Sequence, residues 1–119
     1  MYTAKFLSPM VPSFNIPKTV SFFTDQLKFN IGRDDKTYVI LYKNNVMVHI
    51  LRAGADIGEM EFYLEVDDVD KVWDEMKDNL NGIKVKAPFD REYGMREIHV
   101  IIPETKTLMF IGQVIGQVS

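Results

Sequence analysis

The sequence predicts an α+β fold built from two tandem modules, each with the element order β-α-β-β-β. One observation is a repeated helix: segment 15–27 recurs 53 positions later as segment 68–80, with apolar residues at matching places. A second is that strand-like segments follow each copy, while the small residues of segment 53–58 separate the copies. Solenoids need at least three repeats to bury a core. Two copies in a short chain instead indicate a duplicated unit with a cleft where its halves meet.

Each predicted helix has one apolar face and begins at a capping residue. The apolar positions are Ile16, Val20, Phe23 and Leu27 in the first helix, and Val69, Trp73, Met76 and Leu80 in the second. Their spacing places them on one side of a helix. Asn15 and Asp68 precede the helices, where a side-chain oxygen can accept hydrogen bonds from free backbone N–H groups. Since Trp73 lies on the apolar face, core packing is favoured for it over stacking on a ligand.

The strands follow from alternating hydrophobicity and turn signals. The first module is expected to contain strands at 4–11, 37–42 and 46–52, with Pro12 ending the first and Asn44-Asn45 joining the last two as a hairpin. The second module is expected to contain strands at 60–66, 83–86, 97–102 and 107–112. A chain of 119 residues is long enough for one domain. We therefore expect a single domain, 1–119, with modules at about 1–56 and 57–119.

Composition excludes several function classes. The chain has no cysteine, which excludes disulfides, thiolate nucleophiles and cysteine-based zinc sites. A net charge of −3 argues against nucleic-acid binding, which needs many Lys and Arg side chains. The apolar runs are too short to span a bilayer, and the first residues lack the apolar core of a secretory signal. We expect a soluble, cytoplasmic protein with no nucleic-acid or membrane partner.

Alternation also divides each strand into a core face and an opposite face. Val48, Ile50 and Met109 belong to the core faces. The opposite faces mix aromatic, methionine and ionisable side chains, as small-molecule pockets do. The residues expected to face such a pocket are Met47, His49, Glu61, Tyr63, Glu97, His99 and Phe110, with Tyr38 as a further stacking surface. The alternative is that these faces are simply solvated.

The chain resembles the vicinal oxygen chelate superfamily, which includes glyoxalase I, extradiol dioxygenases, fosfomycin resistance enzymes and bleomycin resistance proteins. The repeated β-α-β-β-β order matches over essentially the whole chain. Pro-Met-Val-Pro-Ser-Phe-Asn at 9–15 is similar to the Pro-x-Leu-Pro-Ser-x-Asp opening of the bleomycin resistance branch, and Tyr-Gly-Met-Arg-Glu at 93–97 to its Trp-Gly-x-Arg-Glu stretch. The resemblance implies a curved mixed sheet around a cup, helices on the convex side, and a homodimer in which the second subunit completes the cup.

The resemblance also implies where a metal would bind. Metal-dependent members place ligands on the first and last strands of each module, which correspond here to Ser8, His49, Glu61 and Phe110. His49 and Glu61 can coordinate a metal, Ser8 is a neutral hydroxyl, and Phe110 cannot coordinate. Zinc and non-haem iron sites need at least one more protein ligand than this partial set supplies. We expect no metal and no other cofactor, with a rearranged His49, Glu61 and His99 site as the alternative.

These features predict a metal-free protein that sequesters an amphipathic small molecule, as bleomycin resistance proteins do. Glu61, Glu65 and Glu97 would favour a cationic ligand, and Arg96 with Glu97 could anchor polar groups or pair with neighbouring side chains. The main alternative is a glyoxalase-type lyase or isomerase that uses a divalent metal or a His49/Glu61 acid–base pair. A third is a domain that acts only through dimerisation. The sequence leaves open whether the chain is an enzyme.

Overall fold

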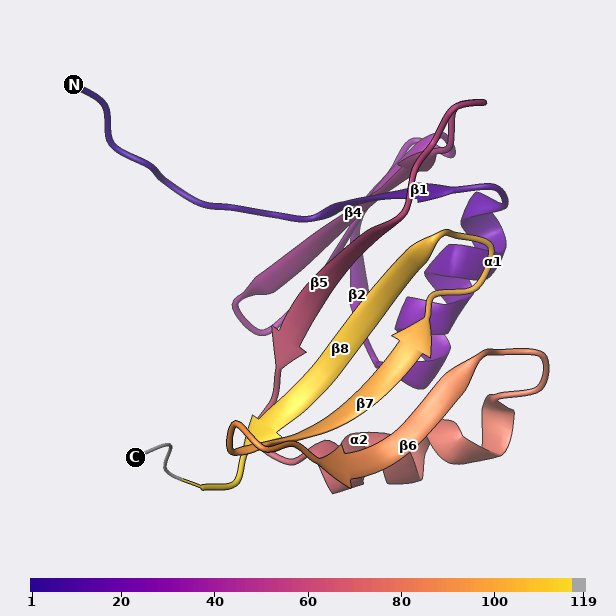
Figure 1. Ribbon diagram of the computed structural model, residues 1–119. Coiled ribbons are helices and arrows are strands. Elements are labelled where there is room, and N and C mark those ends of the chain that lie inside the picture. The colour runs from indigo at the N-terminus through magenta and orange to yellow at the C-terminus, as the bar shows by residue number, and fades with distance from the viewer. Residues whose placement is uncertain (117–119) are drawn as a thin grey trace.

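The computed structural model, which describes residues 1–116, contains two modules of the predicted element order (Figure 1). The first comprises β1 (Met10–Ser13), α1 (Ile16–Ser21) with a π-helical turn at Phe22–Gln26, β2 (Asn30–Asp34), β3 (Tyr38–Lys43) and β4 (Val46–Arg52). The second comprises β5 (Met60–Glu65), α2 (Val69–Met76) with a 3₁₀ turn at Lys77–Asn79, β6 (Val85–Asp90), β7 (Met95–Ile101) and β8 (Thr107–Val114). The α+β class and the two tandem modules are confirmed.

The strands form two four-stranded mixed sheets, one in each module. Sheet A has the order β1-β4-β3-β2, and sheet B has the equivalent order β5-β8-β7-β6. In each sheet the first strand of the module pairs in parallel with the last, which places Met10 beside His49 and Tyr63 beside Phe110. The same strand order in both sheets is what a duplicated unit produces.

Both helices begin at the predicted caps. The side chain of Asn15 accepts a hydrogen bond from the Lys18 backbone N–H, and that of Asp68 accepts one from Lys71. Pro17 fits the first turn of α1, where a backbone N–H would have no partner within the helix. Gly82 has φ +75°, a left-handed conformation that glycine adopts easily, and it lets the chain turn from the second helical segment toward β6.

The first strand differs most from its predicted position. We expected 4–11, but β1 spans Met10–Ser13 and residues 1–9 form an extended arm outside the sheet (Figure 1). Pro12 lies inside β1 because β1 is an edge strand, where a missing N–H breaks no ladder hydrogen bond. The expected strand 83–86 also begins later, as β6. The alternation pattern does not reveal β2, because all of its residues are exposed.

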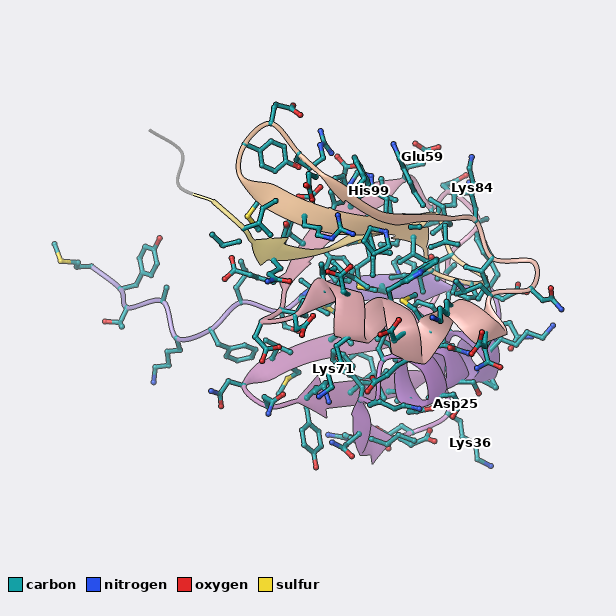
Figure 2. All side chains as sticks on the ribbon, turned by 90° about the horizontal axis from the view of Figure 1, so that it is seen from below. Asp25, Lys36, Glu59, Lys71, Lys84 and His99 are labelled. Atoms are coloured by element: carbon teal, nitrogen blue, oxygen red, sulfur yellow. The ribbon has the colours of Figure 1, made fainter. Side chains whose placement is uncertain are left out.

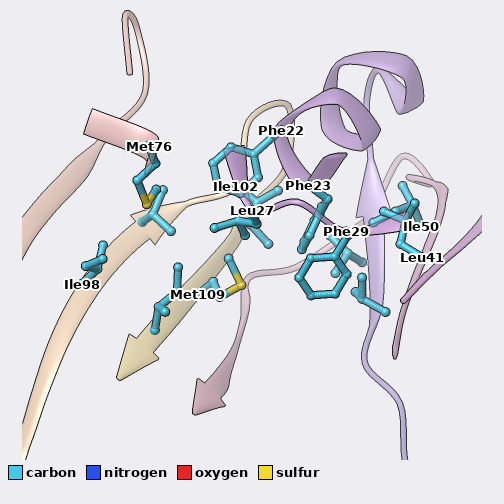
Figure 3. Packing of buried hydrophobic residues seen from close by; sticks show 14 of the residues in the cluster. Phe22, Phe23, Leu27, Phe29, Leu41, Ile50, Met76, Ile98, Ile102 and Met109 are labelled. Atoms are coloured by element: carbon cyan, nitrogen blue, oxygen red, sulfur yellow. The ribbon is translucent and has the colours of Figure 1, made fainter. Parts of the chain in front are cut away.

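One continuous hydrophobic core joins the two modules. In Figure 3, Phe22, Phe23 and Leu27 from the first module lie close to Ile102 and Met109 from the second. Helix α1 contacts β4, whereas α2 contacts β6, β7 and β8. Figure 2 shows the helices between the two sheets. The sheet faces toward the helices carry the buried apolar residues, and the opposite face of each sheet has no helix over it. Trp73 packs against this core, as its place on the helix predicts.

A buried polar link also ties α1 to the second module. The Thr19 hydroxyl donates to the Pro103 carbonyl oxygen at 2.8 Å and lies 2.6 Å from the Ser13 hydroxyl oxygen. The Asn15 backbone N–H donates to that Ser13 oxygen at 3.0 Å. Ser13 and Thr19 are both buried, so water cannot replace these bonds if one is removed.

Thr19→Val is therefore expected to lower the free energy of unfolding by about 1–3 kcal/mol, because it keeps the shape of the side chain and leaves buried partners unpaired. Urea unfolding measures the loss. Thr37→Val is the matched control, since Thr37 is exposed and its change should stay within about 0.5 kcal/mol. Equal effects of the two substitutions would show that the buried link contributes nothing.

Candidate functional site

The open face of sheet B carries a row of cationic and aromatic side chains that crosses all of its strands. The registers place Lys86 beside His99, His99 beside Phe110, and Phe110 beside Tyr63. Residues directly opposite on neighbouring strands share a face of the sheet and contact one another. The centroids of the His99 and Phe110 rings are 4.3 Å apart, and Tyr63 stacks on Phe110 at 6.1 Å. The row thus offers a continuous aromatic surface.

Next to this row, Glu97 is completely buried, with an exposed fraction of 0%. The Tyr93 hydroxyl lies 2.8 and 2.7 Å from its two carboxylate oxygens, His99 Nε2 lies 2.8 Å from Oε1, and Arg91 Nη1 donates to Oε1 at 3.3 Å. Burial by itself raises the pKa of Glu97, but the hydrogen bonds from His99, Tyr93 and Tyr63 outweigh it and hold the pKa below its ordinary value. Glu97 is therefore an ionised carboxylate that its own neighbours satisfy.

Gly112 makes room for Tyr63 over this cluster. A Cβ atom at this position would collide with the Tyr63 hydroxyl and would lie 2.7 Å from Tyr63 Cζ and 3.0 Å from Glu97 Cγ. Burial, together with the charge of Glu97, raises the pKa of Tyr63, so its hydroxyl keeps its proton at neutral pH. The absence of a side chain at Gly112 is what brings Tyr63 close to Glu97.

The open face of sheet A holds a second, smaller group. The Tyr38 hydroxyl hydrogen-bonds to His49 Nδ1, and His49 Nε2 lies 3.3 Å from Met47 Sδ. The Ser8 hydroxyl donates to the Met47 carbonyl oxygen at 3.2 Å. The structure therefore brings Tyr38, Met47 and His49 together, as the strand faces predict. The Ser8 hydroxyl is hydrogen-bonded to a backbone carbonyl oxygen.

Three hollows adjoin these faces, and one of about 520 Å³ is bounded by Glu61, Ile101 and Leu108 of sheet B and by Lys106. A cavity of about 460 Å³ lies between the modules; its lining includes Phe6 and Leu7 of the arm, Met47 on β4 and Tyr63 on β5. A shallower hollow of about 210 Å³ is bounded by Glu61, Phe62, Tyr63 and Phe110. The predicted pocket residues are thus distributed over two sheets. Met47 and Tyr63 share a cavity, and Glu61 shares one with Tyr63 and Phe110.

The donor set does not fit the metal site of the vicinal oxygen chelate superfamily. Phe110 packs against the rings of His99 and Tyr63, and Ser8 bonds to a backbone carbonyl. Within residues 1–116, no cluster of three or more His, Asp or Glu side chains could hold a metal ion. The rearranged His49, Glu61 and His99 site is accordingly not assembled in the described part of this chain.

Arg91 and Tyr93 belong to the Glu97 cluster. The sequence indicated Tyr93 only as part of the 93–97 stretch and did not indicate Arg91. The pairing of β6 with β7 shifts register between Lys86 and Phe89, so the alternation used to assign faces does not extend to this segment. Arg96 was expected either to anchor ligand groups or to pair with neighbours. It pairs with Asp70 at 3.1 Å and with Asp90 at 2.8 Å on the surface.

Among the described residues, no helix is long and apolar enough to cross a membrane. No family model matches the sequence, and no curated protein is similar to it in sequence.

Solved structures do match the fold over nearly the whole chain. TnmS3, an antibiotic binding protein from Streptomyces sp. CB03234, has a TM-score of 0.78 at 15% identity, covering 96% of this chain and 98% of that chain. The bleomycin-binding protein from Streptomyces verticillus complexed with copper(II)-bleomycin has a TM-score of 0.69 at 23% identity, with coverage of 97% and 100%. A glyoxalase/bleomycin resistance protein/dioxygenase from Nocardioides has a TM-score of 0.74 at 12% identity, with coverage of 100% and 93%. The chain therefore has the fold that its sequence resemblance implies.

Proposed function

We propose that this protein sequesters an amphipathic aromatic small molecule and does not transform it. The observation that carries the proposal is the aromatic row of His99, Phe110 and Tyr63 on an open sheet face, in which Tyr63 also lines a cavity of about 460 Å³. Aromatic surface with sparse polar anchors is typical of small-molecule sites. Proteins of the same fold include a bleomycin-binding protein and an antibiotic binding protein, which supports sequestration as the function.

Glu61 is an acidic side chain of this site that can meet a ligand directly. It is exposed and borders the hollow formed with Tyr63 and Phe110. A carboxylate beside aromatic rings attracts a cationic group both through its charge and through the electron-rich ring faces. Glu97, which we expected to contact the ligand in the same way, is buried and committed to its own neighbours. The preference for a cationic group therefore rests on Glu61, together with Glu65, which is exposed and lines the cavity between the modules.

A second copy of the chain would complete the cup. In the single chain the open faces leave large apolar side chains in solvent: the exposed fraction is 41% for Met47 and 42% for Tyr63, and Phe6 and Leu7 of the arm are also exposed. Contiguous exposed apolar surface marks a site of association. We expect sedimentation to show a dimer at micromolar concentration. A monomer under these conditions would show that the dimer prediction is wrong.

The proposal includes a metal-free site, and elemental analysis of the purified protein tests it. We expect less than stoichiometric metal, and no thermal shift with Ni²⁺, Zn²⁺ or Fe²⁺, because the partial set of His49 and Glu61 is too small for these ions. Stoichiometric metal that is lost in His49→Gln would overturn the metal-free reading. The acid–base alternative needs His49 and Glu61 at one substrate. Within one chain they lie on β4 and β5 of different sheets, so this alternative would need residues from two subunits.

A cationic aromatic probe tests the binding site itself. We expect 2-naphthylmethylammonium to bind the wild-type protein and to bind Glu61→Gln roughly threefold to tenfold more weakly, because one charge-assisted contact is lost. Isothermal titration calorimetry measures both affinities. Glu75→Gln on the exposed side of α2 is the matched control, since it makes the same change in net charge away from the site. Equal losses in the two variants would show that Glu61 does not contact the probe.

A further inference from the structure

Burial of the Glu97 carboxylate matters more for the positions of its hydrogen-bonding partners than for the stability of the fold. An ionised group inside a protein loses several kcal/mol of hydration, and its ion pairs commonly do no more than offset that loss. The cluster does, however, fix the side chains that bond to it. Arg91, Tyr93 and His99 all direct a donor at Glu97, and all three lie at the open face of sheet B. Glu97 thus holds a set of donors in place on the face where we propose that the ligand binds.

Arg91 retains unused hydrogen-bonding capacity in this arrangement. A guanidinium carries five N–H groups, and within residues 1–116 the side-chain hydrogen bonds of Arg91 involve Nη1, while Nε lies 3.7 Å from Glu92 Oε2 in an ion pair. Its guanidinium carbon lies 4.9 Å from the centroid of the Tyr93 ring and 5.3 Å from that of Phe89, so the group contacts aromatic surface on two sides of the cluster. The exposed fraction of the side chain is 24%. Among the described residues Nη2 makes no hydrogen bond, so it is available to an acceptor that a ligand brings.

Lys86 adds a second cation at the same end of the row. Its Nζ lies 3.9 Å from the centroid of the Phe89 ring, and the residue pairs in register with His99. The row therefore has cations at its β6 end and aromatic rings along β7, β8 and β5, and Glu61 lies two residues before Tyr63 on β5, opposite Leu108. Since neighbouring strands lie about 4.8 Å apart, the whole row is about 14 Å long. A ring system of two or three fused rings fits along the row.

We propose that Arg91 and Lys86 form a subsite for a carboxylate group on a ligand whose aromatic rings stack along His99 and Phe110. Glu97 is a positioning residue, which acts through Arg91 and His99 without touching the ligand. This inference rests on the proposed sequestering function and adds a carboxylate to its aromatic ligand on the β6 side of sheet B, apart from the cationic group that would face Glu61 on β5. A group with two acceptor oxygens matches the planar fork of Arg91 better than a cation or a neutral alcohol does.

Three naphthalene probes distinguish binding through this subsite from binding of the apolar rings alone. Isothermal titration calorimetry on the full-length protein compares 2-naphthoate, 2-naphthylmethanol and 2-naphthylmethylammonium. We expect 2-naphthoate to bind at least tenfold more tightly than the neutral alcohol, Arg91→Gln to abolish that difference, and Lys86→Gln to reduce it by about threefold. Lys71→Gln on α2 is the matched control and should leave it unchanged, because Lys71 is exposed on α2, away from the open face of sheet B.

Glu97→Gln distinguishes positioning from bulk electrostatics. The substitution removes a negative charge, so electrostatics alone would strengthen the binding of 2-naphthoate. Loss of positioning has the opposite effect, and we expect binding about fivefold weaker in a variant whose NMR spectrum still shows a folded protein. Tighter binding of 2-naphthoate to Glu97→Gln would overturn the positioning role.

The three probes also separate failure of this inference from failure of the proposed function. If 2-naphthoate binds no better than 2-naphthylmethanol, or if Arg91→Gln binds it as wild type does, the anionic subsite is wrong. Should 2-naphthylmethylammonium still bind through Glu61 in that case, the sequestering function stands. If none of the probes binds, both the subsite and the aromatic binding function are overturned.

Discussion

Phe23→Ala is expected to lower the free energy of unfolding by about 3–5 kcal/mol, the usual cost of removing a buried phenylalanine ring. The side chain is 1% exposed and makes edge-to-face contacts with Phe22 at 5.5 Å and Phe29 at 5.4 Å. It also lies where α1 approaches the second module, near Met109 (Figure 3). Because domains are stable by only about 5–15 kcal/mol, this single truncation removes a large share of the total.

Urea unfolding, followed both by far-ultraviolet circular dichroism and by Trp73 fluorescence, measures this loss. Trp73 belongs to the second module, whereas Phe23 belongs to the first. Since one core joins the modules, we expect both signals to shift together in a single transition. Phe14→Ala is the control, because Phe14 is 55% exposed and should change stability by less than about 0.5 kcal/mol. Two separate transitions would contradict a common core.

Glu97→Gln is expected to lower the free energy of unfolding by about 1–3 kcal/mol at pH 7, because a neutral amide replaces a buried carboxylate that accepts charge-assisted hydrogen bonds. The cost should also depend on pH. The pKa of Glu97 in the folded protein lies below its ordinary value of 4.5, so the folded state binds a proton less readily than the unfolded state. The stabilisation is therefore complete above pH 4.5 and declines as the pH falls through the folded pKa.

Chemical unfolding between pH 7 and pH 3 tests whether the stabilisation by Glu97 declines as the pH falls. The difference between wild type and Glu97→Gln should shrink as the solution is acidified, because the wild-type carboxylate loses its charge. Glu75→Gln, which removes an exposed carboxylate, provides the reference for general electrostatic effects. A difference that stays constant over this range would show that the buried carboxylate is not the group that titrates.

The sequence predicts the fold and most of the open faces because both depend on short-range periodicity. Alternation assigns Met47 and His49 to one face, and Tyr63 and Phe110 to another, without knowledge of the partner strands. It misplaces the first strand, because the apolar residues of the arm look like a strand whether or not a neighbour pairs with them. A strand forms only where β4 supplies that neighbour.

The Glu97 cluster could not be predicted in the same way. The face of Glu97 follows from alternation, but its burial depends on Tyr93 beyond a turn and on the missing side chain at Gly112 of the next strand. Arg91 follows the register shift in β6 and lies in the turn before β7, so its place in the cluster depends on both features. These contacts are set by strand pairing across the sheet, which one sequence does not display.

Pairing of the first strand of each module with its last also determines when each sheet can form. β1 has no neighbour other than β4, and β5 has none other than β8, within the described sheets. As the chain leaves the ribosome, β5 must therefore wait through the synthesis of α2, β6 and β7 before its partner appears. Contacts between residues so distant in sequence slow folding. Newly made β5, with its exposed edge, is thus the segment for which a chaperone would matter most.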